Sequence, residues 1–134
     1  ESHPYLSQEN LIRLAKQHGL EVTAFSPLGS LSYVELEMAE QNESILDQSV
    51  VKEIAERLNC SPVQVLLRWG TQRGTSVLAK SINAERMAEN LASNNIELTP
   101  KDMMAISNLN RNRRFNDPGD FCEGAFNSFY PIYD

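Results

Sequence analysis

The segment Leu78-Ala79-Lys80-Ser81-Ile82-Asn83-Ala84-Glu85-Arg86 reads as the end of a short buried strand followed at once by a helix that Asn83 caps. Ligands of parallel α/β folds bind where strands end, and the start of a helix attracts anions. Lys80 could hold a phosphate as a point charge and Arg86 through its planar guanidinium. The alternative, which spacing alone favours, is a pair of solvated surface cations, because exposed Lys and Arg are common.

A second strand-to-turn segment lies upstream, where residues 20–25 read as a strand and Ser26-Pro27-Leu28-Gly29-Ser30 as a turn. Phe25, at the end of this strand, could stack on a planar ring. Serine hydroxyls and the backbone N–H groups near Gly29 could meet a pyrophosphate. The alternative is that Phe25 belongs to the core.

The whole pattern alternates helix-like and strand-like stretches, which predicts an α/β class with parallel strands. Residues 30–46 read as a long loop. Such a loop is either a functional or mobile segment or, alternatively, a solvated insertion. Two strands do not make a stable sheet, so the pattern requires further chain. Helices are expected over residues 8–18 with Ser7 as cap, over 48–59, from the capping box at Ser61 and Gln64 to Gly74, over 83–91, and from Thr99 to about Leu109.

Composition narrows the function classes. Twelve Lys and Arg against eighteen Asp and Glu give a net charge of −6, which argues against nonspecific nucleic-acid binding. An apolar fraction of 41% argues against whole-chain disorder, and no run approaches the roughly 20 apolar residues of a membrane helix. Cys60 and Cys122 make no disulfide framework, so we expect a cytoplasmic protein. The chain starts at Glu1 rather than Met, so we expect a fragment. It shows no signal peptide, which agrees with a cytoplasmic location. We assign no metal site.

The tail, residues 110–134, is rich in aromatic residues and turn formers, so we expect it to lie over an apolar surface or a pocket mouth. Arg111, Arg113 and Arg114 form either an interaction patch or, more commonly for such a cluster, a solvated turn.

These segments, in this order, resemble the second half of an aldo-keto reductase. Residues 1–8 resemble the stretch after the sixth barrel strand, and residues 23–30 the seventh-strand motif. Residues 78–81, with Arg86, Glu89 and Asn90, resemble the late cofactor motif. The tail is most similar to xylose and aldose-phosphate reductases. The resemblance implies a partial domain over residues 1–134, the C-terminal half of a (β/α)8 TIM barrel with parallel strands plus a C-terminal tail; a full barrel needs about 250 residues.

The resemblance also implies roles. Phe25 would stack on the nicotinamide, although most relatives carry Tyr there. Ser26, Leu28 and Ser30 would line the pyrophosphate, and Glu89 and Asn90 would contact the adenine end. Lys80, Ser81 and Arg86 would hold the adenosine 2′-phosphate, which favours NADPH (or NADP+) over NADH. Candidates for the substrate pocket are Phe121, Phe126 and Tyr130.

No residue of this chain is assigned as catalytic, because the family's Tyr, Lys, Asp and His come from the absent first half. His3 and His18 do not match that His. Two functions therefore stay open. One is NADPH-dependent reduction of an aldose or other small aldehyde by hydride transfer, with this chain supplying most of the cofactor site. The other is a truncated, catalytically inactive fragment, or a dinucleotide-binding or structural subunit without turnover. The sequence leaves the oligomeric state undetermined.

Overall fold

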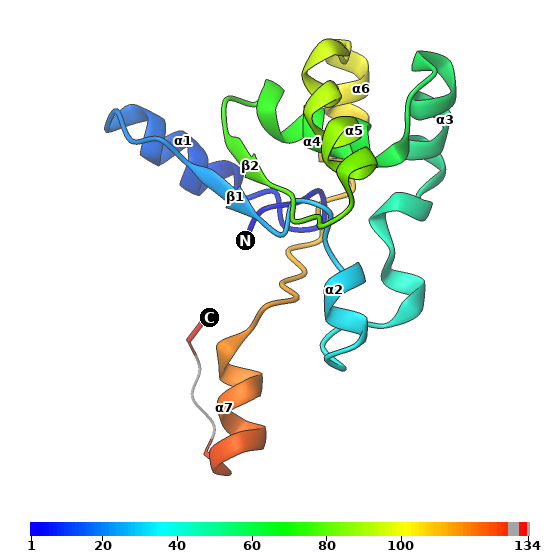
Figure 1. Cartoon of the computed structure of the whole chain (residues 1–134). Helices are drawn as coiled ribbons and strands as arrows, with labels where there is room; N and C mark the ends of the chain where they lie inside the picture. Colours follow the sequence, from blue (N-terminus) through cyan, green and yellow to red (C-terminus); the bar gives the residue numbers. More distant parts are fainter. Residues whose placement is uncertain (129–131, 134) are drawn as a thin grey trace.

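Helices dominate the chain, and a short parallel sheet lies at one side of them (Figure 1). The computed structural model describes residues 1–128 and 132–133, without the side chains of 31, 32, 120 and 121. The elements, in chain order, are α1 (Glu9–Gln17), β1 (Thr23–Phe25), α2 (Leu31–Val34), the 3-10 turns η1 (Gln41–Glu43) and η2 (Ile45–Asp47), α3 (Ser49–Leu58), α4 (Pro62–Gln72), β2 (Ser76–Leu78), α5 (Ala84–Ala92), η3 (Ser93–Asn95), α6 (Pro100–Ser107) and α7 (Pro118–Phe126).

The two strands pair in parallel, as the alternating pattern predicted, with Ala24 opposite Val77 and Phe25 opposite Leu78. Successive residues of a strand face opposite sides of the sheet. Val77 faces α4, where a β-carbon built on Gly70 would lie 2.7 Å from it. Leu78 is 63% exposed on the other side. The prediction of a buried strand is therefore wrong for the described structure, in which only one face of β2 is covered.

The core lies between α3, α4 and α6. Val51 and Ile54 of α3 pack with Leu66 and Trp69 of α4 and with Ile106 of α6, all of them buried. These are the apolar faces that helical spacing predicted for α3 and α4. This packing makes α4 the central element, because α3, α5, η3 and β2 all contact it.

Local capping signals set the starts of α4, α5 and α6, as predicted. Ser61 and Thr99 form reciprocal capping boxes with Gln64 and Asp102, and each is followed by Pro at the first helical position. Asn83 accepts the Arg86 N–H at the start of α5.

The predicted cap of the first helix is wrong. Helix α1 starts after Gln8, which has a positive φ of 55° and provides no side-chain cap. Ser7 instead makes long-range contacts: its N–H donates to Asn110 Oδ1 at 3.0 Å, and its carbonyl accepts from Arg73 Nη2 at 2.7 Å. Tertiary hydrogen bonds thus hold the backbone of Ser7, and its side chain does not cap the helix.

Residues 30–46 are not a solvated insertion. They contain α2 and η1, and they bury Tyr33, Ala39 and Ile45 in the core. The segment is therefore part of the packing that supports the turn after β1.

The tail divides into a docked part and an exposed helix. Phe115 is buried, whereas α7 lies apart from the other helices and its Phe126 is 71% exposed (Figure 1). The expectation that the tail covers an apolar surface therefore holds for Phe115 and not for Phe126. Helix α7 was not predicted, although Asp117 caps it and Pro118 occupies its first position.

The arginines of the tail make contacts within the chain. Arg111 lies over the ring of Tyr5 at 3.8 Å, and Arg114 over the ring of Tyr133 at 3.7 Å. Internal cation–π contacts thus hold both arginines. The Arg111 side chain remains 46% exposed, and the interaction patch stays a prediction. No helix in the described part of the chain combines the length and apolar character needed to cross a membrane.

Candidate binding site

A hollow of about 480 Å³ lies where β2 meets α5. It brings together segments that are far apart in the sequence: the turn after β1, η2, the start of α4, and the connection from β2 into α5. Its lining residues are Leu28, Leu46, Val63, Lys80, Ser81, Ile82, Asn83, Arg86, Glu89 and Asn90. Most of the predicted cofactor residues, all of them except Phe25, Ser26 and Ser30, are therefore in one place.

Two basic residues, Lys80 and Arg86, form what we call the cationic rim of this hollow. Both are exposed, and in the part of the chain that the structure describes neither makes an ion pair. They are positioned by the backbone between them. Asn83 N–H donates to Ser81 Oγ at 3.1 Å, and Arg86 N–H donates to Asn83 Oδ1 at 3.0 Å. The rim therefore presents positive charge beside the start of a helix, which suits an anionic group.

The other wall of the hollow is tied to α4. Gln64 Nε2 donates to the Glu89 carbonyl at 3.1 Å, and Gln64 also closes the capping box of α4. Helix α5 is thereby held against α4 along the edge that carries Glu89 and Asn90. Leu46 and Val63 add apolar surface, which a planar ring could cover.

The residues of the turn after β1, residues 26–30, are distributed differently. Only Leu28 reaches the hollow. Ser26 has a positive φ of 51°, and its Oγ lies 2.6 Å from Tyr33 OH. Ser30 is buried and donates through Oγ to the Glu43 carbonyl at 2.9 Å. Phe25 is 40% exposed at the end of β1, so it is not a core residue, and it does not line the hollow.

Of the three predicted substrate residues, only Phe126 is described with its side chain. Phe126 lies on α7, is 71% exposed and lines no part of the hollow. Tyr130 lies outside the described residues, and so does the side chain of Phe121. Their role in substrate binding stays a prediction.

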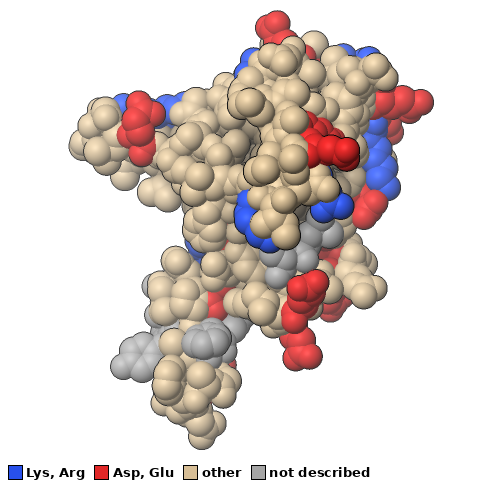
Figure 2. All heavy atoms as spheres, viewed as in Figure 1, with Lys and Arg blue, Asp and Glu red and all other residues tan. Residues whose placement is uncertain are grey.

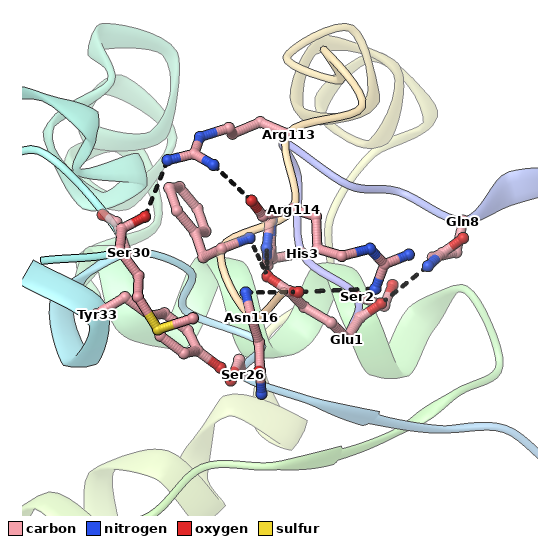
Figure 3. A network of polar contacts seen from close by, with 12 residues as sticks. Glu1, Ser2, His3, Gln8, Ser26, Ser30, Tyr33, Arg113, Arg114 and Asn116 are labelled. Atoms are coloured by element: carbon pink, nitrogen blue, oxygen red, sulfur yellow. Dashed lines mark hydrogen bonds and ion pairs between the residues drawn. The ribbon is translucent and has the colours of Figure 1, made fainter. Parts of the chain in front are cut away.

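A buried carboxylate network lies behind the turn (Figure 3). The Glu1 carboxylate accepts from His3 Nε2 at 2.8 Å and from the Phe115 and Asn116 N–H groups at 2.9 and 3.1 Å. Burial raises the pKa of Glu1, but these hydrogen bonds outweigh it and leave the pKa below its ordinary value. This carboxylate therefore anchors the tail as an anion.

Several residues of the site were not predicted. Val63 was assigned only to a helix, Leu46 fell at the edge of the long loop, and Ile82 and Asn83 were treated as connection and cap. Leu46 reaches the hollow only because the 30–46 segment folds back on the core, for which the local sequence carries no signal.

Comparison with known proteins agrees with this geometry. Residues 1–111 match the family model described as "Aldo/keto reductase family". A probable NAD(P)H-dependent D-xylose reductase of Aspergillus fumigatus is 47% identical over 120 residues, covering 88% of this chain and 38% of that protein. The NAD(P)H-dependent D-xylose reductase of Kluyveromyces lactis is 41% identical over 132 residues, covering 96% of this chain and 40% of that protein. The chain thus spans about two fifths of the length of these curated relatives.

Proposed function

Because the chain belongs to the aldo-keto reductase family, we propose that it is the coenzyme-binding C-terminal portion of an NADPH-dependent reductase. The substrate would be an aldose or another small aldehyde, reduced to the alcohol. The names of the relatives, NAD(P)H-dependent D-xylose reductases, support a nicotinamide coenzyme and an aldose.

The observation that carries the proposal is the gathering of Lys80, Ser81 and Arg86 with Glu89 and Asn90 around one hollow. The unpaired cations of the rim suit the 2′-phosphate, which NADPH has and NADH lacks. Leu28 reaches the same hollow from the turn after β1, so this turn borders the hollow where the family resemblance places the pyrophosphate. The donor set therefore fits an adenosine 2′-phosphate at one end of a dinucleotide.

The coenzyme, when bound, supplies the hydride that reduces the carbonyl. The residues of this chain bind and orient it: the cationic rim holds the phosphate, and Phe25, exposed at the end of β1, offers its ring to the nicotinamide. The proton that completes the reduction would come from a general acid outside this chain.

The exposed surface supports a larger barrel. Among the described residues the sheet has two strands, and Leu11 and Leu14 of α1 and Leu78 of β2 are each more than half exposed. Figure 2 shows one face of the molecule, on which large areas carry no acidic or basic side chains. Isolated two-stranded sheets are marginal, and free edges invite pairing. We propose that the chain is the C-terminal half of a (β/α)8 barrel in a cytoplasmic enzyme.

Coenzyme titration of the protein expressed from its complete reading frame tests the proposal. We expect tighter binding of NADPH than of NADH, and NADPH-dependent reduction of D-xylose if the reading frame extends upstream by about 150 residues. Equal affinity for both coenzymes would overturn the 2′-phosphate assignment. NADPH binding without turnover would instead indicate a dinucleotide-binding subunit.

A further inference from the structure

A carboxylate clamp joins the 30–46 segment to the tail. Glu43, on η1, accepts from Arg113 Nε at 3.0 Å and from Arg113 Nη2 at 3.2 Å, in a two-point contact with both of its oxygens. Arg111 Nη2 adds a third contact at 3.2 Å, and the Glu40 N–H a fourth at 3.0 Å. The Glu43 side chain is only 16% exposed. A paired fork of this kind is geometrically specific.

The backbone of the same residue holds the turn after β1. The Glu43 carbonyl accepts the hydroxyl of Ser30 at 2.9 Å. Two residues further on, Ile45 packs against Gly29, where an added β-carbon would lie 2.4 Å from its Cδ1. A shift of η1 would therefore be transmitted directly to residues 29 and 30.

The tail completes the support through one aromatic ring. Phe115 is 1% exposed and stacks on Tyr33, with ring centroids 6.1 Å apart. The Tyr33 hydroxyl in turn lies 2.6 Å from Ser26 Oγ, at the start of the turn. Arg113 lies over the Phe115 ring, with its guanidinium 4.8 Å from the ring centre. Figure 3 shows Ser26, Tyr33 and Ser30 next to the segment that carries Arg113 and Asn116.

We infer that Glu43 and Arg113 are positioning residues that hold the 26–30 turn in the geometry required for the pyrophosphate of the coenzyme. This inference rests on the proposed function. The clamp reaches the start of the turn through Phe115 and Tyr33, and its end through Ser30. Within the described part of the chain, no hydrogen bond or ion pair joins the clamp to Lys80 or Arg86, and the cap of α5 positions Arg86 independently. The C-terminal tail therefore controls the pyrophosphate half of the site and leaves the adenosine half alone.

Two ligands separate the halves of the site. NADPH spans both, whereas adenosine 2′,5′-bisphosphate occupies only the cationic rim. We would titrate both by calorimetry into the protein from its complete reading frame, as wild type and as Glu43→Gln and Arg113→Lys. Arg57→Lys is the matched control, because Arg57 donates to Asp102 at 2.7 Å and joins α3 to α6 elsewhere in the molecule. Arg113→Lys keeps the charge and loses the fork.

Wild type should bind both ligands. Glu43→Gln and Arg113→Lys should raise the NADPH dissociation constant about tenfold and leave that of the bisphosphate within about twofold, while Arg57→Lys changes neither. Unchanged NADPH binding in both clamp variants, or equal losses for the two ligands, would overturn the clamp but not the proposed function. A wild type that binds neither ligand would overturn both. If Glu43→Gln does not fold, Arg113→Lys decides.

Discussion

The two connections at the candidate site are built in different ways. The turn after β1 is supported from behind by long-range contacts: Ser30 is buried against Glu43, and Phe115 of the tail stacks on Tyr33. The connection after β2 is formed by neighbouring residues, because Ser81 and Asn83 cap the next helix and leave Lys80 and Arg86 in solvent.

Because the two connections are built differently, substitutions in them should affect different properties: the free energy of unfolding on the turn side and coenzyme affinity on the rim side. Phe115, which supports the turn through Tyr33, is buried, so its loss disturbs the fold and the turn together. A residue of the cationic rim contacts little else in the described structure, so its loss should affect only the ligand. The two connections can therefore be distinguished by comparing the free energy of unfolding with coenzyme affinity.

The largest expected effect is on the turn side. Phe115→Ala should lower the free energy of unfolding by about 3–5 kcal/mol, because a ring that is 1% exposed is removed from the contacts with His3, Tyr5 and Tyr33. Urea denaturation of wild type and variant measures this loss of unfolding free energy. Phe126→Ala, the same change at a ring that is 71% exposed, should stay within about 0.5 kcal/mol. Similar losses in the two variants would show that the tail is not docked through Phe115.

Substitution of a glycine in the turn should come next. Gly29 has φ +74°, and a β-carbon there would lie 2.4 Å from Ile45 Cδ1. Gly29→Ala should therefore cost about 2–4 kcal/mol, from backbone strain together with overpacking. Gly19 has a similar φ of +67° with nothing within 4 Å, so Gly19→Ala reports strain alone, about 1–2 kcal/mol. Thermal melts of the two variants give the difference, and equal costs would mean that Ile45 moves aside freely.

On the rim side, Lys80→Ala and Arg86→Ala should each weaken NADPH binding by about 1–3 kcal/mol, the loss typical of a charge-assisted contact. NADH binding and the free energy of unfolding should hardly change. Lys101→Ala, at an exposed cation on α6, is the control for net charge. The 2′-phosphate assignment fails if titration finds equal losses for NADPH and NADH.

The smallest effect is the pH dependence of the stability that Glu43 contributes. Hydrogen bonds from Arg113, helped by the charges of Arg113 and Arg111, hold the pKa of Glu43 below its ordinary value of 4.5 despite partial burial. A carboxylate with a lowered pKa stabilises the folded state above its unfolded pKa, and this contribution is lost as pH falls through the folded value. The stability difference between wild type and Glu43→Gln should therefore be full near neutral pH and shrink below about pH 4.5. Urea melts across this range test it, with Glu56→Gln at an exposed site of α3 as control; a difference that is constant with pH would exclude an ionised clamp.

Sequence reasoning predicted the local features well. The caps at Ser61, Asn83 and Thr99 depend on residues three positions apart, so they are readable from the chain and the structure has all three. The parallel pairing and the gathering of Lys80 with Arg86 followed from the order of elements. The cap at Ser7 failed because helix α1 starts one residue later, after Gln8, whose positive φ of 55° sets the entry into the helix.

The sequence by itself therefore determined the family, the starts of α4, α5 and α6 and the placement of the cationic rim, because each depends on residue types at short spacing. Only the tertiary structure decided how the turn after β1 is supported. Its contacts join Glu43, Arg113 and Phe115, whose separation along the chain leaves no periodic or motif signal. Their proximity results from burying Phe115 and pairing its neighbouring charges, a gain in free energy that exists only once the tail has folded back on the core.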